Sequence, residues 1–344
     1  MNQHQNRKDD HLQLANNLYT NTDAFNELRI IHNSLPELAF SEIDLSNNCF
    51  QQEFEYPFYI EAMTGGSNKT NKINEQLIKV AKETNLPIAL GSSSIALKDR
   101  EQAKVLQQLR SEYKNGFIIA NLGANSSAED AQYIVDLLQA NALEIHINAL
   151  QEILMPEGDR DLKWINNIQQ IVQTVSVPVI VKEIGTGMSK QTIQKLINIG
   201  ANYINISGKG GTNFAKIENN RSNEPASYLN NWGQTTIESL LEAKQIDSNH
   251  HQISIIASGG VKNPLDIIKC LILNAKLVGI AGTFLNILLT SGTEQLIKTI
   301  NTWKIELKKI MLLLGSKDID QLQNVDYILS SNLLNYCKQR NIKI

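Results

Sequence analysis

Apolar runs alternate with amphipathic segments eight times along the chain, and this alternation limits the possible fold more than any other feature. The runs are rich in β-branched residues and lie at 57–66, 86–94, 116–124, 142–148, 177–187, 202–211, 252–260 and 276–283. Because they are continuously apolar, they are expected to be strands buried on both faces. Eight successive βα units predict an α/β fold, a (β/α)8 barrel, with a doubly wound open sheet as the alternative.

The segments between the strands carry helix signals. Ile73, Leu77 and Val80 fall on one helical face. Helix starts are predicted from two N-capping serines and a proline at a first helical position: Ser127, Ser189 and Pro264.

The domain organisation follows from the same pattern. Residues 1–56 precede the first strand and are expected to form an N-terminal extension, and a substrate-binding arm within it is implied only by the family resemblance given below. Residues 57–344 would form the barrel and, from about 286, the C-terminal helices, as one domain overall. One connection, 212–234, is polar and Asn-rich, and we expect an elaborated active-site loop there.

Composition excludes several classes of protein. A net charge of −3 over 344 residues indicates neither a nucleic acid nor an anionic membrane as the partner. The N-terminus lacks the apolar core of a signal peptide, and no apolar run is long enough to span a membrane. The three cysteines have no CxxC spacing, which favours a reducing, cytoplasmic location.

Nearly every predicted strand ends in glycine or polar residues. In (β/α)8 barrels the chemistry gathers at these ends. The glycines at 259–260 and at 282 follow strands seven and eight, where backbone N–H groups often hold a phosphate. The alternative is that they serve only the strand–helix turns.

Lys182 follows the buried run "VPVIV" and would be partly desolvated. It could be a cation that faces a bound anion, a Schiff-base lysine, or a structural residue that pairs with Glu183. The sequence shows no obvious pair of carboxylates for acid–base chemistry.

A polar cluster ends the fourth strand. His146 and Asn148 are two residues apart and share a side of the strand, and Gln151 and Glu152 follow directly. His146 is either a hydrogen-bonded core residue or a ligand contact. A single glutamate with oxygen neighbours suits Mg²⁺ better than zinc.

Taken together, the strand-end motifs resemble those of the type 2 isopentenyl-diphosphate isomerases, which are FMN-dependent (β/α)8 barrels. The matching motifs run in family order: "RKDDH", "AMTGG", "GSSS", "ANLG", "HINALQE", "MPEGDR", "VKEIGTGMS", "SGKGGTNF", "NWGQ" and "ASGG". The combination of "RKDDH", "HINALQE" and "SGKGGTNF" is the most specific part of the resemblance.

The resemblance implies a role for each matching residue. FMN would contact Ala62, Met63, Thr64, Ser92, Asn121, Lys182, Ser207, Thr212, Gly259, Gly260, Val261, Lys262, Ala281 and Gly282. The substrate would be held by Arg7, Lys8, His11, Ser92, Ser94, Asn148 and Gln151, and Glu152 would hold Mg²⁺. The catalytic roles would fall to Lys182, Gln151 and His146. From the residues alone, Arg7, Lys8 and His11 could equally be a solvated tail.

The implied activity is the interconversion of isopentenyl and dimethylallyl diphosphate in isoprenoid biosynthesis. Reduced FMN would act as the acid and base, and NADPH would be needed only to reduce it. Family members are commonly homo-oligomers, so a tetramer or octamer is expected. Two alternatives remain: an FMN-dependent 2-hydroxy acid oxidase or dehydrogenase on the same barrel, and a non-catalytic flavin- or phosphate-binding protein.

Overall fold

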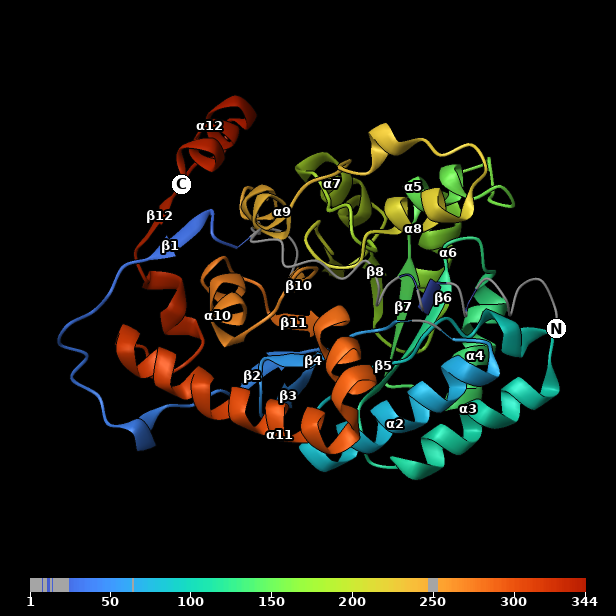
Figure 1. The fold of residues 1–344 in the computed structure, drawn as a ribbon, viewed down its shortest axis with the longest axis horizontal. Helices are drawn as coiled ribbons and strands as arrows, with labels where there is room; N and C mark the ends of the chain where they lie inside the picture. The colour runs from blue at the N-terminus through green and yellow to red at the C-terminus, as the bar shows by residue number, and fades with distance from the viewer. Residues whose placement is uncertain (1–7, 9–10, 13, 15–24, 64, 247–252) are drawn as a thin grey trace.

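The computed structural model describes residues 8, 11–12, 14, 25–63, 65–246 and 253–344, and its centre is a closed barrel of eight strands (Figure 1). Each strand pairs in parallel with its neighbours in chain order, and the last pairs with the first. The barrel prediction is therefore confirmed and the open sheet is excluded. The strands are β4 (Phe58–Ile60), β5 (Ile88–Ala89), β6 (Ile118–Gly123), β7 (Ala142–His146), β8 (Val179–Lys182), β9 (Tyr203–Asn205), β10 (Ser254–Ser258) and β11 (Leu277–Ile280).

The strands are buried on both faces, as their apolar sequences predict. Every residue of β4, β8 and β11 is buried, because helices cover the outside and side chains fill the inside. The strands are shorter than the apolar runs because the polar ends of those runs turn away into the loops at the mouth of the barrel.

A layer of helices surrounds the barrel (Figure 1). Ser127 and Ser189 accept hydrogen bonds from Asp130 N and Thr192 N, and Pro264 is the first residue of its helix, so these three predicted starts are confirmed. The helices are α2 (Asn68–Thr84), α3 (Arg100–Glu112), α4 (Ala128–Leu138), α6 (Ile165–Thr174), α7 (Lys190–Asn198), α9 (Thr236–Ala243), α10 (Pro264–Ile272) and α11 (Gly282–Leu314). The part of the chain that the structure describes also has four 3-10 turns: η1 (Phe40–Glu42), η2 (Ser94–Leu97), η3 (Ser227–Leu229) and η4 (Asp320–Asn324).

Two extra helices lie above the C-terminal ends of the strands. Helix α5 (Ala149–Leu154) follows β7, and α8 (Phe214–Arg221) follows β9. The elaborated loop that was expected over 212–234 contains two ordered elements, α8 and η3. Asn213 caps α8 by accepting a hydrogen bond from Lys216 N. Helices α5 and α8 pack against each other and bring two distant loops together.

A hairpin closes the opposite, N-terminal end of the barrel. Strands β2 (Asn47–Cys49) and β3 (Gln52–Phe54) pair antiparallel. The Phe50 ring stacks on Phe117 with centroids 5.5 Å apart and lies 4.9 Å from Tyr203, and Phe54 meets Phe117 edge-on. These aromatic rings fill the floor of the barrel beneath the polar interior.

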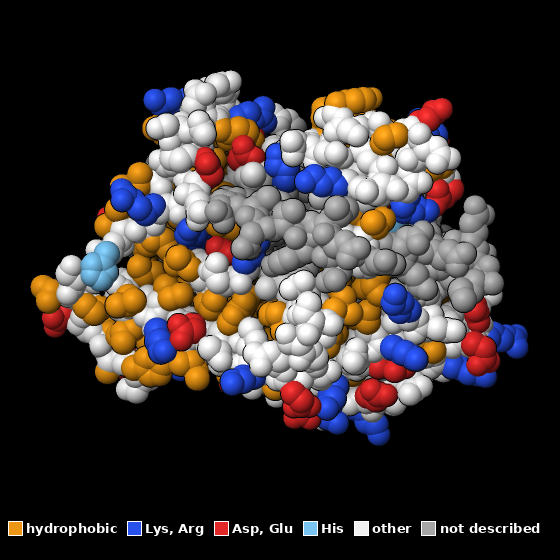
Figure 2. Space-filling model, in the orientation of Figure 1, with side chains coloured by type: hydrophobic (Ala, Val, Ile, Leu, Met, Phe, Trp, Pro, Cys, Tyr) orange, Lys and Arg blue, Asp and Glu red, His pale blue; other side chains and the backbone are white. Residues whose placement is uncertain are grey.

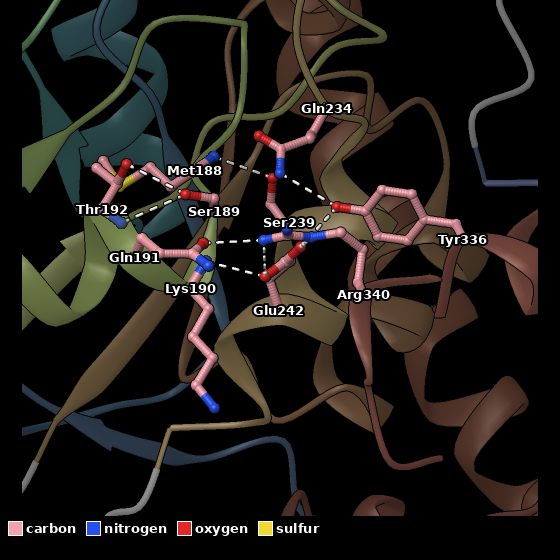
Figure 3. A network of polar contacts seen from close by, with 10 residues as sticks. All are labelled: Met188, Ser189, Lys190, Gln191, Thr192, Gln234, Ser239, Glu242, Tyr336 and Arg340. Atoms are coloured by element: carbon pink, nitrogen blue, oxygen red, sulfur yellow. Dashed lines mark hydrogen bonds and ion pairs between the residues drawn. The ribbon is translucent and has the colours of Figure 1, made fainter. Parts of the chain in front are cut away.

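The two ends of the described chain meet beside the barrel. Strand β1 (Leu28–Ile30) pairs antiparallel with β12 (Tyr327–Leu329), and α12 (Ser331–Arg340) follows. Figure 3 shows how α12 is held: Arg340 Nε donates to Glu242 Oε1 at 2.6 Å, and Tyr336 donates to the same oxygen at 2.8 Å. Gln234 Nε2 in turn donates to the Tyr336 hydroxyl, so α12 is tied to the loop that precedes α9. None of the described helices is long and apolar enough to cross a membrane.

Candidate active site

A deep cavity opens at the C-terminal ends of the strands. It encloses about 1220 Å³, including the space open to solvent at its mouth. All the described residues expected to bind the cofactor line it: Ala62, Met63, Ser92, Asn121, Lys182, Ser207, Thr212, Gly259, Gly260, Val261, Lys262, Ala281 and Gly282. Thr64, the remaining one, lies outside the described residues. The structure thus brings residues from all parts of the barrel sequence to one surface.

Glycine backbones form one wall of this cavity. A Cβ on Gly259 would lie 2.0 Å from Gly208 O, and one on Gly260 would lie 2.8 Å from Gly210 C. Both residues also have positive φ, 96° and 78°, which side chains disfavour. The turns after β9 and β10 therefore pack backbone to backbone and present main-chain groups to the cavity.

Two helices begin at this wall. Helix α10 starts just beyond Lys262, and α11 starts at Gly282, and both positions line the cavity. Thr283 Oγ1 donates to Val261 O at 2.6 Å and locks the two turns together. Helix N-termini and exposed backbone N–H groups favour anions. This cradle fits the phosphate of a flavin mononucleotide, because glycine main-chain groups line it and the helix dipoles favour negative charge.

A second cavity adjoins the first. Both are lined by Lys8, His11, Ser92, His146 and Gln151. Ser94, Asn148 and Glu152 line only the second. The described residues that were expected to hold the substrate and the metal thus gather beside the expected cofactor cavity, whereas Arg7 lies outside the described residues.

Glu152 stands on α5 and is half-buried. Asn148 Nδ2 donates to its Oε1 at 2.8 Å and Asp159 N donates to its Oε2 at 2.7 Å, so the carboxylate is held in place. Within the described ranges, no three His, Cys, Asp or Glu side chains form a metal site. A single carboxylate fits Mg²⁺ that takes its other ligands from a diphosphate and water.

Glu218 on α8 connects the substrate-side residues, and the sequence did not single it out. Its Oε1 accepts from Gln151 Nε2 at 2.8 Å and lies 2.9 Å from His11 Nε2. Its Oε2 accepts from Arg221 Nη1 at 2.5 Å. Burial opposes its charge, but these partners outweigh burial and lower the pKa of Glu218. Burial, in turn, lowers the pKa of His11.

Lys182 projects into the barrel at the floor of the first cavity. It pairs with His146 of β7 on one side and with Asn205 of β9 on the other. Its buried Nζ donates to Glu183 O at 3.1 Å. The Glu183 carboxylate instead accepts hydrogen bonds from Gly185 N and from Thr186, so it does not pair with the lysine. The structural reading of Lys182 as the ion-pair partner of Glu183 is therefore wrong.

The structure also brings together a pair of carboxylates that was not obvious in the sequence. Glu61, which directly follows β4, and Glu144 of β7 both point into the barrel, are almost fully buried, and contact the hydroxyl of Tyr59. Each stands inside an apolar run, where a lone charge carries little signal. The period-2 pattern could have found Glu144, because it shares the inner side of β7 with His146.

Comparisons with known proteins agree with this architecture. Residues 103–328 match the model of the FMN-dependent dehydrogenase family. The chain is 48% identical over 345 residues to an isopentenyl-diphosphate delta-isomerase of Limosilactobacillus reuteri, covering 99% of each sequence. It is 46% identical over 343 residues to the enzyme of the same name from Lactococcus lactis, covering 98% of each.

Among solved structures, a mandelate oxidase is similar in fold. The TM-score is 0.64 over 93% of this chain and 90% of the other, with 13% sequence identity. At that identity the likeness concerns the barrel alone.

Proposed function

Because the chain belongs to the FMN-dependent type 2 isopentenyl-diphosphate delta-isomerase family, we propose that it interconverts isopentenyl and dimethylallyl diphosphate in isoprenoid biosynthesis. One observation carries this proposal beyond family membership. The described residues expected for the cofactor line one cavity, and those expected for the diphosphate and the metal line its neighbour. The barrel, residues 57–344, would carry both, and the extension 1–56 would add Arg7, Lys8 and His11.

The first cavity would hold FMN, with its phosphate at the glycine cradle and its ring near Met63, Asn121 and Lys182. When bound in reduced form, FMN would supply the acid and the base for the reaction. The buried ammonium of Lys182 would stabilise negative charge at the floor of the cavity, and it costs no reorganisation because the fold already holds it in position.

The second cavity would hold the diphosphate. Lys8 and His11 would contact it from the extension, and Glu152 would place Mg²⁺ against it. Ser92, Ser94 and Asn148 would add neutral hydrogen bonds. Neutralising the diphosphate in this way would hold the five-carbon chain between the two cavities.

Moving the double bond requires one carbon to gain a proton and another to lose one, through a tertiary cation that water would capture. Leu12, Ile184 and Phe214 line the first cavity and would exclude water from the alkene. Gln151 and His146 stand where the two cavities meet and would border the reacting carbons.

NADPH would be needed only to reduce FMN, because the isomerisation itself changes no oxidation state. We place the protein in the cytoplasm, since its three cysteines are all buried and unpaired.

A homo-oligomer, a tetramer or octamer, is part of the proposal. Figure 2 shows hydrophobic side chains gathered at the lower left, over the segment near η1 and the end of α11. The exposed apolar residues of these two segments include Leu35, Phe40 and Leu313. An apolar patch of this kind is typical of a subunit interface, and light scattering measures the size of the assembly.

The proposed function is tested in an assay under anaerobic conditions. The purified protein would be loaded with FMN, reduced with NADPH and given isopentenyl diphosphate with Mg²⁺. We expect dimethylallyl diphosphate in amounts far above the NADPH consumed. Product that tracks NADPH one for one, or none at all, would refute the proposal.

A 2-hydroxy acid oxidase or dehydrogenase is the second candidate, because its family model matches 103–328. Such an enzyme needs a histidine base and arginines for a substrate carboxylate. The segment 259–276, which follows β10, contains neither histidine nor arginine. Reduction of bound FMN by lactate or mandelate would favour this candidate.

A further inference from the structure

Two buried glutamates beneath the cavity cannot both be charged without a large cost. Glu61 and Glu144 are 2% and 0% exposed, and the Tyr59 hydroxyl oxygen lies 2.8 Å from Glu61 Oε2 and 3.3 Å from Glu144 Oε1. Burial, and then the charge of Glu61, raise the pKa of Glu144 well above its usual range, and the nearby Lys182 only partly offsets them. The pair therefore retains one proton.

The hydrogen-bond donors are shared unequally between the two carboxyls, and most of them point at Glu61. Its Oε1 accepts from Ala62 N at 2.7 Å, and its Oε2 accepts from the Tyr59 hydroxyl at 2.8 Å and from Asn205 Nδ2 at 2.7 Å. Both oxygens of Glu61 are therefore used as acceptors. Glu144 has a single amide donor, Asn121 Nδ2, at 3.0 Å from Oε2.

The Tyr59 hydroxyl then locates the proton on Glu144. A hydroxyl has one hydrogen and two acceptor sites. The hydrogen is used in the shorter contact, to Glu61, and one acceptor site receives Asn205 Nδ2 at 3.1 Å. The remaining contact, with Glu144 Oε1, is satisfied only if Glu144 donates. In this arrangement Tyr59 is fully satisfied and no two lone pairs face each other.

The same arrangement determines which nitrogen of His146 carries its hydrogen. Asn121 uses its NH₂ group on Glu144, so its Oδ1 faces His146 Nδ1, 2.9 Å away, and must accept. His146 is neutral, since burial, then Lys8, then Lys182 lower its pKa to about 3. Its hydrogen therefore sits on Nδ1, and Nε2 keeps a lone pair.

We propose that Glu144 is a positioning residue that holds one buried proton and, through Asn121, fixes His146 as the neutral tautomer with Nε2 as an acceptor at the cavities. His146 Nε2 would therefore accept a hydrogen bond from a bound group that carries a donor, such as an ammonium or an N–H group. An unprotonated phosphate oxygen is disfavoured there, because it would face a lone pair. The inference concerns protonation and goes beyond the proposed reaction, so it can fail while the isomerase proposal stands.

The direct test is ¹⁵N NMR of the histidine rings in the full-length protein, without turnover. The chain has six histidines, and the signal lost in His146→Gln identifies the one in question. We expect an Nδ1–H neutral ring that does not titrate between pH 6 and pH 8. An Nε2–H ring or an imidazolium would overturn the proposal.

Two substitutions at Glu144 separate positioning from packing. Glu144→Gln can still accept from Asn121 and donate to Tyr59, so the tautomer of His146 should be unchanged. Glu144→Leu removes the acceptor, so Asn121 can turn over and the ring should show both tautomers. If Glu144→Gln also lost the Nδ1–H form of His146, the buried proton of the wild type would not be on Glu144. This comparison remains decisive even if the Leu variant fails to fold.

Thermal stability gives an independent measurement. Above about pH 4.5 the unfolded wild type releases the Glu144 proton whereas the native state keeps it, so native stability falls as pH rises. Glutamine has no proton to release. The melting temperature of Glu144→Gln should therefore exceed that of the wild type by a margin that widens from pH 5 to pH 8. The exposed Glu53→Gln is the matched control and should show a constant difference. A margin for Glu144→Gln that stays constant or narrows would mean that Glu144 is ionised.

Discussion

Glu218→Ala is expected to destabilise the protein and weaken substrate binding together. The side chain of Glu218 is fully buried and holds Gln151, His11 and Arg221. Its removal takes away the acceptor of the Gln151 amide and the 2.5 Å contact of Arg221 Nη1, while the contact of Arg221 to Glu157, at 3.0 Å, stays. Breaking a buried charged pair from one side costs about 3–5 kcal/mol.

The loss of unfolding free energy can be measured as a decrease in melting temperature. For a chain of this size each kcal/mol corresponds to roughly 2 °C, so Glu218→Ala should melt about 6–10 °C lower. Steady-state kinetics should show a raised KM for the diphosphate, because His11 and Gln151 lose their support. FMN content should hold, since Glu218 does not line the first cavity.

Two matched variants make this prediction refutable. Glu218→Gln keeps the volume and one acceptor for Gln151, so it should lose roughly half as much as the alanine variant. Glu157→Ala removes only the half-exposed partner of Arg221 and should cost about 1 kcal/mol or less. If Glu218→Ala melted within a degree of Glu157→Ala, the buried network would not stabilise this region as we infer.

Three further substitutions test separate parts of the molecule. Lys182→Ala should lower the isomerisation rate by about 10²–10³ with little change in melting temperature, and activity near wild type with FMN still bound would remove Lys182 from the mechanism. Glu152→Gln should raise the Mg²⁺ concentration for half-maximal activity by about tenfold or more, and an unchanged Mg²⁺ titration would exclude Glu152 as a ligand. Arg340→Ala leaves the buried Glu242 without its charged donor. It should cost about 1–3 kcal/mol in thermal unfolding and leave KM unchanged, and a shifted KM would contradict a purely structural role for α12.

The barrel was predictable because its signal is local and repeated. Each apolar run and each amphipathic segment indicates its own element, and eight units in series favour closure. Caps such as Ser127 and Ser189 are likewise decided by neighbouring residues in the chain. The glycines that follow β10 and β11 could be assigned to a phosphate site because their position in the barrel, rather than any distant partner, indicates that role.

The features of the site and the fold that the sequence did not predict depend on tertiary contacts. Glu218 lies in a polar, Asn-rich segment where a charged residue is unremarkable, and only folding brings it to Gln151, 67 residues away. Glu61 and Glu144 are each an isolated charge within an apolar run, and their significance arises only when β4 and β7 face one another across the barrel. The strands of the floor hairpin, β2 and β3, were not predicted because three-residue strands carry too short a pattern.

The pairing of β1 with β12 has a consequence for synthesis on the ribosome. Strand β1 emerges early, but its hydrogen-bonding partner lies near the far end of the sequence. Until β12 emerges, β1 is an unpaired edge, which is a site for wrong association. A chain arrested before β12 would carry a complete set of barrel strands with the unpaired edge of β1 beside them.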